Sequence, residues 1–291
     1  MKKSLIAAVL MLVAGGAYAA NFEELAVKAS DLREAAAVNQ DLPKGYVSGL
    51  NPVINVPVKP VAWVQLRGGQ FSMGTDTLGE DFKDAKPVHR VGLGAFMMSK
   101  APITVGQYSE CVMKGACSEP ETKGSCNWGK PGREDHPVNC VTWAQADQYA
   151  KFAGARLPSE SEWEYAATGE GGNQKYPWGD TDPASNTWLY GSDPDSFAKF
   201  DTVPVCSRPK GNTAQGLCDM VGNVSQWVQD KYQASYTGAP TDGGAVEGDN
   251  FYRAVRGGSF YRLDSRFLRA DARFYEAPNF RDDYLGFRIV R

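Results

Sequence analysis

The sequence predicts an α+β fold with few helices, short strands and much irregular loop. Of the 291 residues, 42% are hydrophobic and 22% are charged, which is typical of a chain that folds around a sizeable core. The chain also carries 31 glycines and 17 prolines. A helical bundle of this length does not tolerate so many, because glycine lowers helix stability and proline interrupts the backbone hydrogen bonds.

The first 19 residues have the three parts of a secretory signal peptide. Two lysines follow the initial methionine, Leu5–Val13 form an apolar stretch, and Ala17-Tyr18-Ala19 is a small-x-small cleavage site. The apolar stretch is shorter than the ~20 residues that a membrane-spanning helix needs, and no later run is long enough. We therefore expect cleavage before Ala20 and a periplasmic or secreted protein without a membrane span.

Residues 20–60 carry two patterns ahead of the main domain. Within 22–38, apolar residues recur at spacings of three and four, which predicts a short amphipathic helix: Leu25, Ala29, Leu32 and Ala36. Four prolines follow between positions 41 and 60, and they indicate an extended linker. We expect the folded domain to span 61–291.

Two helices and three strands are signalled within that domain. Thr142 with Gln145, and Ser159 with Glu162, have the capping-box spacing, and each pair precedes a run of apolar residues at helical spacing. Gly154 ends the first run. Short strand-like segments follow at 251–255, 267–274 and 285–290.

The six cysteines are expected to form disulfides, because an exported chain meets an oxidising compartment. Counting alone leaves 15 connectivities open, and proximity along the chain favours three local pairs: Cys111 with Cys117, Cys126 with Cys140, and Cys206 with Cys218. The alternative is a metal cluster. It is disfavoured because the sequence has no C-x-x-C pair and only two histidines, His89 and His136.

The charge balance bears on the partners of the protein. The sequence contains 31 Lys and Arg against 34 Asp and Glu, a formal charge of −3. No strongly basic field is available to attract nucleic acid or an anionic membrane. We therefore expect no nucleic-acid partner, and the sequence leaves the oligomeric state open.

An ordered series of motifs runs through the domain: Arg67-Gly68-Gly69-Gln70-Phe71, Pro102-Ile103-Thr104-Val105, Arg156-Leu157-Pro158-Ser159-Glu160, Gly216-Leu217-Cys218-Asp219-Met220-Val221-Gly222-Asn223-Val224, Arg256-Gly257-Gly258-Ser259 and Leu285-Gly286-Phe287-Arg288. In order and spacing the series resembles the sulfatase-modifying-factor superfamily, whose founding member is the formylglycine-generating enzyme. The resemblance covers about 61–291. It implies a C-type-lectin-like core with few helices, small antiparallel sheets and irregular chain that is often held by calcium.

The resemblance also implies a copper site, and this sequence departs from it. In the formylglycine-generating enzymes two cysteines after the Gly-Gly-Ser motif bind copper, whereas Arg262 and Phe267 stand at those positions here. Neither side chain offers a lone pair to a metal, and soft thiolates are what copper(I) needs. The iron-dependent relatives use three histidines, but this chain has two. We therefore expect no copper–cysteine or three-histidine iron centre.

Residues 253–291 hold nine arginines against five acids. Arginine forks bind carboxylate or phosphate, which would favour an anion-binding pocket. The alternative is that Arg256, Arg269, Arg273, Arg281 and Arg288 belong to the family framework and pair with buried acids. We favour that interpretation for these five. Arg262 and Arg266 lie in the active-site segment outside the framework, and are the first candidates for substrate contact.

Further candidates complete this site. Ser259 and Asp283 join Arg262 and Arg266 as candidate catalytic residues, with Asp282 and Asp283 available as bases. Tyr261 and Tyr284 join the two arginines as candidate ligand-binding residues. At Tyr284 the family's oxidases usually carry a polar, substrate-binding residue.

The resemblance also implies calcium loops. Asp219, the carbonyls of Gly222 and Val224, and Gln226 match one loop, in which the family usually has Glu at the last position. An amide in place of that carboxylate weakens such a site. Asn186 and Asp195 match a second loop more loosely. Turns held by hydrogen bonds without metal remain the alternative.

The leading hypothesis is an exported domain that binds or processes a peptide-like or anionic ligand in a cleft lined by Ser259, Tyr261, Arg262, Arg266 and Asp283. One alternative is an exported oxidase or tautomerase that matures a peptide-derived chromophore, as in pyoverdine-type siderophores. A true formylglycine-generating oxidase is the least favoured, because the two cysteines are missing.

Overall fold

The computed structural model describes residues 59–76, 79–183, 201–261 and 264–291. The chain divides into two compact units, Met1–Ile54 and Asn55–Arg291, and the described residues belong to the second. The predicted signal peptide, the helix at 22–38 and nearly all of the Pro-rich linker lie outside the described residues. Among those that are described, no helix is long and apolar enough to cross a membrane.

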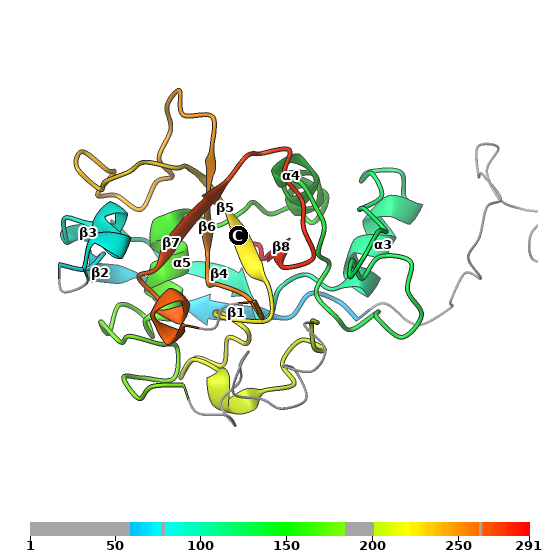
Figure 1. Ribbon diagram of the computed structural model, residues 1–291, viewed down its shortest axis with the longest axis horizontal. Helices are drawn as coiled ribbons and strands as arrows, with labels where there is room; N and C mark the ends of the chain where they lie inside the picture. The colour runs from blue at the N-terminus through cyan, green and yellow to red at the C-terminus, as the bar shows by residue number, and fades with distance from the viewer. Residues whose placement is uncertain (1–58, 77–78, 184–200, 262–263) are drawn as a thin grey trace, which may run out of the picture. The chain divides into compact units, whose positions relative to one another are not determined.

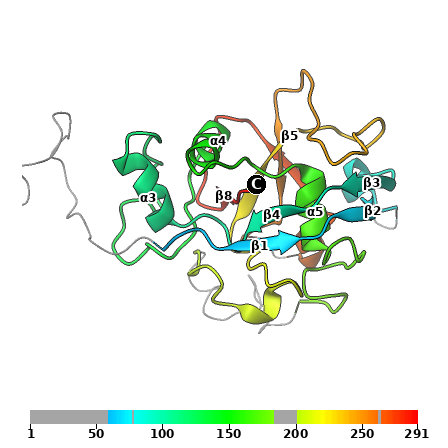
Figure 2. The same cartoon turned by 180° about the vertical axis from the view of Figure 1, so that it is seen from behind.

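Three small sheets form the framework (Figure 1). Strands β1 (Trp63–Leu66) and β4 (Phe96–Ser99) make one antiparallel pair, which lies toward the viewer in Figure 2. Strands β2 (Gly69–Met73) and β3 (His89–Leu93) make another. The third sheet has the order β7-β6-β5-β8, with bounds Arg273–Glu276, Arg253–Arg256, Ser225–Lys231 and Leu285–Phe287. Its β5–β8 pair is parallel, whereas the other pairs are antiparallel.

In the described part of the chain, three α-helices pack against these sheets: α3 (Val105–Met113), α4 (Trp143–Phe152) and α5 (Glu160–Ala167). Both predicted capping boxes are confirmed, at Thr142 with Gln145 and at Ser159 with Glu162. We did not predict α3, although its first turn has the same signature, since Thr104 and Gln107 also form a capping box. Short 3-10 turns complete the elements: η2 (Glu80–Ala85), η3 (Pro209–Gly211) and η4 (Ser265–Leu268).

The three predicted strands are shorter in the structure than in the sequence analysis. Arg253–Arg256 and Leu285–Phe287 fall largely within the expected segments. The prediction of one strand over 267–274 is wrong, because Ser265–Leu268 is a 3-10 turn and the strand begins only at Arg273. The pattern of apolar side chains does not distinguish a strand from a 3-10 turn here, because the turn also buries an apolar side chain, that of Leu268. The predicted fold class, with few helices, small sheets and long loops, is confirmed.

Among the described residues, three hydrophobic clusters fill the core, and a fully buried tryptophan lies in each of the two larger ones. Trp163 of α5 packs in one cluster and Trp227 of β5 in the other. Burying large apolar side chains on both sides of β5 contributes a few kcal/mol per side chain. The third sheet is therefore fixed from both faces, and the loops that leave its strands start from defined positions.

A buried ionic network links α5 to the third sheet. Arg273 places its guanidinium on Glu160 at 2.7 and 2.8 Å, and Arg256 contacts Glu160 at 3.2 Å and Glu164 at 2.5 Å. All four side chains are nearly inaccessible, and pairing is what permits their burial.

The expected pairing of the five framework arginines is confirmed for three of them. Arg256 and Arg273 belong to the buried network, and Arg269 binds Asp271. Arg288 instead donates to main-chain carbonyls and to Gln226, and Arg281 is exposed.

All six cysteines form the three predicted local disulfides: Cys111–Cys117, Cys126–Cys140 and Cys206–Cys218. Each one closes a loop of fewer than 20 residues, and Cys111–Cys117 joins helix α3 to the segment that follows it. Such a crosslink stabilises the folded state mainly by restricting the unfolded chain. No free cysteine remains.

Candidate functional site

The candidate site begins where β6 ends. Gly257 has a φ of +94°, and a Cβ there would lie 2.5 Å from the carbonyl oxygen of Met220, so the turn requires glycine. Ser259 is buried, with 1% of its surface exposed, and its hydroxyl accepts a hydrogen bond from the amide of Tyr261 at 3.3 Å. Ser259 therefore shapes the turn, and the next exposed side chain is Tyr261.

Tyr261 lies against the loop that precedes β8. Its hydroxyl donates to Oδ2 of Asp283 at 3.3 Å. Its ring lies perpendicular to that of Tyr284, with centroids 5.9 Å apart. Tyr261 thus lies close in space to Asp283 and Tyr284, two other predicted site residues that are more than 20 positions away in the sequence.

The loop that carries Asp283 and Tyr284 is held from several sides. The buried Asn139 donates to the carbonyl of Asp283 at 2.6 Å, and the amide of Cys140 donates to the carbonyl of Asp282 at 3.0 Å. Cys140 is itself fixed by its disulfide with Cys126. The disulfide therefore supports the backbone of the candidate site.

The surroundings of Asp283 and Tyr261 favour the protonated form of both groups. Burial raises the pKa of Asp283, and the neighbouring Asp282 adds to the rise, while hydrogen bonds from Tyr261 and Ser125 oppose it. Burial also raises the pKa of Tyr261, as does the charge of Asp283. A carboxyl with a raised pKa beside a neutral hydroxyl is a combination suited to moving a proton.

Glu276 is a site residue that the sequence analysis did not select. Its Oε1 accepts a hydrogen bond from the hydroxyl of Tyr284 at 3.1 Å. The sequence pattern did not indicate Glu276, because the predicted strand at 267–274 ended before it, whereas β7 begins at Arg273 and includes it. Together with Asp282 and Asp283, it makes the described part of the site acidic and aromatic.

The structure describes one of the two candidate arginines, Arg266. Arg262 lies outside the described residues, so its predicted role stays a prediction. Arg266 is exposed and donates through Nε and a terminal nitrogen to Oδ2 of Asp264, at 2.9 and 2.7 Å. Its charge is thus directed to a carboxylate two residues away, and an anionic ligand would have to compete with that partner.

The position of the second copper cysteine holds a phenyl ring. Phe267 packs against Phe82 and Phe274, with ring centroids 5.6 and 6.2 Å away. Since every cysteine in the chain is in a disulfide, no thiolate pair is available to copper(I). The donor set of the family's copper centre is absent from this chain.

Each of the two histidines has partners of its own. The ring of His89 lies tilted against that of Tyr236, with centroids 4.8 Å apart. The Nδ1 of His136 lies 2.8 Å from the hydroxyl of Thr202 and 3.0 Å from Arg133. Burial and the charge of Arg133 lower the pKa of His136 to about 4. Both histidines therefore have structural partners.

The candidate calcium loop fits a metal only in part. Oε1 of Gln226 accepts from Nε1 of Trp163 at 2.9 Å and from Nε of Arg288 at 2.7 Å, so it is not available as a ligand while those bonds hold. Asp219 is buried and accepts from the amide of Cys206 at 2.9 Å. Calcium here stays a prediction that rests on Asp219 and the carbonyls of Gly222 and Val224. Asn186 and Asp195 lie outside the described residues.

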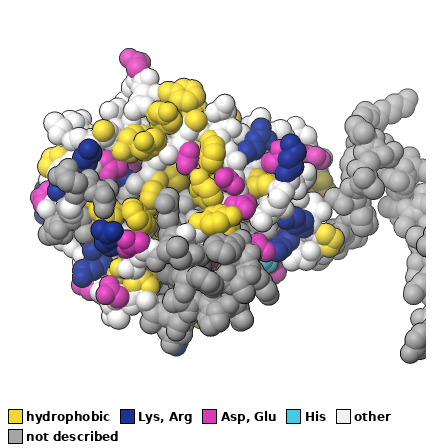
Figure 3. Space-filling model, in the orientation of Figure 1, with side chains coloured by type: hydrophobic (Ala, Val, Ile, Leu, Met, Phe, Trp, Pro, Cys, Tyr) yellow, Lys and Arg dark blue, Asp and Glu magenta, His cyan; other side chains and the backbone are white. Residues whose placement is uncertain are grey.

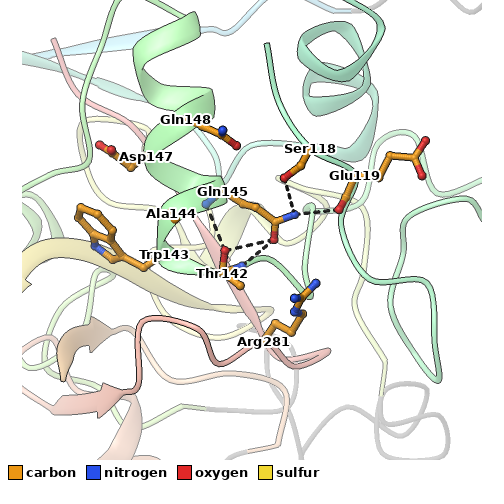
Figure 4. A pocket seen from close by; sticks show the side chains of 9 residues that line it. All are labelled: Ser118, Glu119, Thr142, Trp143, Ala144, Gln145, Asp147, Gln148 and Arg281. Atoms are coloured by element: carbon orange, nitrogen blue, oxygen red, sulfur yellow. Dashed lines mark hydrogen bonds between the residues drawn. The ribbon is translucent and has the colours of Figure 1, made fainter. Parts of the chain in front are cut away.

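A separate hollow of about 630 Å³ lies beside the first turn of α4 (Figure 4). Gln145 spans it, donating to the Ser118 hydroxyl at 3.1 Å and to the Glu119 carbonyl at 2.8 Å. Arg281 reaches toward it from the loop before β8 (Figure 4). Because its central polar groups already bind one another as a helix cap, we do not place the functional site there.

Comparison with known proteins identifies the family. The Sulfatase-modifying factor enzyme 1-like domain family matches residues 53–291, and the chain belongs to it. The match begins a few residues before the expected boundary at 61, and so does the compact unit that starts at Asn55.

Among curated relatives, the formylglycine-generating enzyme of Streptomyces coelicolor is 31% identical over 280 residues, covering 78% of this chain and 88% of that protein. The serine/threonine-protein kinase Pkn1 of Chlamydia trachomatis is 32% identical over 247 residues, but this chain spans only 37% of its length. Among solved structures, PvdO from Pseudomonas aeruginosa superposes with a TM-score of 0.66 at 28% identity, covering 79% of this chain and 93% of that one. These names cover different activities, so membership alone does not define the reaction.

Proposed function

We propose that this protein is an exported member of the family that binds a peptide-like ligand at Tyr261, Asp283 and Tyr284, without copper–thiolate chemistry. The observation that carries the proposal is the altered donor set, in which the copper positions are Arg262 and Phe267 and all cysteines are in disulfides. The other motifs of the family are present in the sequence around these positions. A ligand at Tyr261, Asp283 and Tyr284 would therefore contact aromatic rings and a carboxylate, with no thiolate available.

The chemistry of the described side chains favours the peptide-like ligand over the anionic one. Tyr261 has 43% of its surface exposed, so its ring and hydroxyl are accessible to a ligand. Asp283 binds the hydroxyl of Tyr261, and the negative charges of Asp282 and Asp283 both act on it. Arg266 is directed to Asp264. Amide and ammonium donors of a peptide suit such acceptors, and perpendicular aromatic rings favour a cation or an apolar side chain.

A second candidate function is tautomerisation of a peptide-derived chromophore, which the Tyr261–Asp283 contact favours. In that reaction Asp283 takes a proton from one atom of the ligand while the Tyr261 hydroxyl gives one to another. The proton on Asp283 then returns to the tyrosine oxygen across the 3.3 Å contact, which restores both groups. Proton numbers balance and no electron acceptor is needed.

The binding proposal is tested by capture of peptides and small molecules from a periplasmic extract on the immobilised mature protein, analysed by mass spectrometry. Asp283→Asn and Tyr261→Phe should lose the ligands that the wild type retains. Tyr252→Phe is a matched control, because Tyr252 is 42% exposed and contacts Tyr275 rather than the site. Equal capture by all four proteins would contradict the proposal.

The copper part is tested separately with copper(I) supplied as its acetonitrile complex, so that no thiol reductant opens the disulfides. We expect no tight stoichiometric uptake. Stoichiometric binding that persists with the disulfides intact would show a copper site made from other donors and would overturn this part of the proposal.

A further inference from the structure

A second cluster of exposed rings lies on the other side of β7. Phe251, Tyr252 and Tyr275 are 57%, 42% and 48% exposed, although each is a large side chain that folding usually covers. Their rings form a chain, with centroids 5.5 Å apart from Phe251 to Tyr252 and 5.1 Å from Tyr252 to Tyr275. Figure 3 shows hydrophobic side chains gathered on this face, over β7 and the loop before β6, with acidic side chains among them.

This cluster is distinct from the candidate site. Successive side chains of a strand point to opposite faces, and Tyr275 packs on Tyr232 at 4.3 Å, whereas Glu276 binds the hydroxyl of Tyr284. The proposed function therefore does not account for these rings.

The rings are held in place before any partner arrives. The hydroxyl of Tyr232 donates to Asp84 at 2.9 Å, and the guanidinium of Arg273 lies 5.1 Å from its ring. Asn250 links the loop to β5, since its Nδ2 donates to the carbonyl of Tyr232 at 2.7 Å while its Oδ1 accepts from the amide of Tyr252 at 2.9 Å. A surface that is already ordered loses little entropy on binding.

The exposed charged residues of the loop between β5 and β6 are acidic. From 232 to 252 the chain contains no Lys or Arg, and its three acids are all exposed: Asp242, Glu247 and Asp249. Arg253, which follows, stacks on Trp143 at 3.9 Å and donates to the carbonyl of Gln229. Two copies of this acidic surface would repel each other, so a partner of positive charge fits it better than a second copy.

We propose that Phe251, Tyr252 and Tyr275 form a docking surface for a Lys- and Arg-rich segment of another protein. Cations are attracted to the faces of aromatic rings, and the aliphatic stems of Lys and Arg cover apolar surface while their heads reach the acids. Exposed tyrosines of this kind often dominate the binding energy of a protein interface.

The test uses the full mature protein and two fluorescein-labelled peptides of equal length, one alternating Lys and Leu and the other alternating Glu and Leu. Fluorescence anisotropy should detect binding of the Lys peptide only, and the affinity should fall at least tenfold between 0.05 and 0.5 M salt. Tyr275→Ser and Phe251→Ser should each weaken binding about tenfold. Met113→Ser replaces a 60% exposed apolar side chain of α3 that belongs to neither site, and it should leave the affinity unchanged.

Circular dichroism spectra and melting curves of each variant establish that it is folded, and Phe251 provides a second variant outside the strands. Equal binding by wild type, Tyr275→Ser and Phe251→Ser would overturn the proposal. So would equal binding of the two peptides, or a dimer in analytical ultracentrifugation that Tyr275→Ser abolishes. This experiment changes only residues outside the candidate site, so failure here and failure of the proposed function are observed separately.

Discussion

Replacing Gln226 by methionine tests how much the centre of the domain depends on one buried amide. Gln226 is fully buried and makes four hydrogen bonds: from Trp163 and Arg288 to its oxygen, and from its nitrogen to the carbonyls of Asp219 and Met220 at 2.8 and 3.2 Å. It thereby joins α5, β8 and the candidate calcium loop. Methionine keeps the volume of the side chain and removes all four bonds.

The expected cost follows from the partners that are left behind. An unsatisfied buried donor costs about 1–3 kcal/mol, and the guanidinium of Arg288 lies at the upper end because it is charged. Two donors and two carbonyls lose a partner, and partial relaxation brings the sum to roughly 3–5 kcal/mol. For a domain of this size, 1 kcal/mol corresponds to about 2–4 °C, so the melting temperature should fall by at least ~6 °C.

Differential scanning calorimetry of the wild type, Gln226→Met and Gln148→Met measures this effect. Gln148 is exposed on α4, so the same chemical change there should shift the melting temperature by less than ~1 °C. A Gln226→Met protein that melts within 2 °C of the wild type would refute the reasoning, because the four bonds would then contribute nothing net.

The remaining predictions concern pH, disulfides and calcium. Because His136 binds its proton only near pH 4 in the folded state and near 6.5 when unfolded, stability should fall by on the order of 1 kcal/mol as pH drops from 6.5 to 4, and urea titrations of His136→Gln should lack this slope. Paired Cys126→Ser and Cys140→Ser changes should cost ~3 kcal/mol and weaken ligand capture, since this disulfide supports the Asp283 loop; unchanged capture would argue against that support. If Asp219 binds calcium, the melting temperature in millimolar calcium should exceed that in chelator by a few degrees and Asp219→Ala should remove the difference, whereas identical melting of the wild type would indicate a hydrogen-bonded turn.

Features that depend on neighbouring residues along the chain could be predicted from the sequence. Two helices were predicted from Thr142 and Ser159 because a capping box is complete within four residues. The disulfides were predicted because each joins cysteines that are close in sequence. The family was recognised from ordered motifs, because their residues and spacing can be read directly from the sequence.

Contacts between distant parts of the chain could not be predicted in this way, because they depend on the packing of whole elements. Tyr261 and Asp283 are 22 residues apart and Gln226 and Arg288 are 62 apart, and no local pattern encodes either contact. Arg266 was expected in the cleft but binds Asp264, and Glu276 was overlooked although it binds Tyr284. Long-range pairing depends on how whole strands are placed in the sheet, so a side chain's type indicates its chemistry while the packing of β5, β7 and β8 selects its partner.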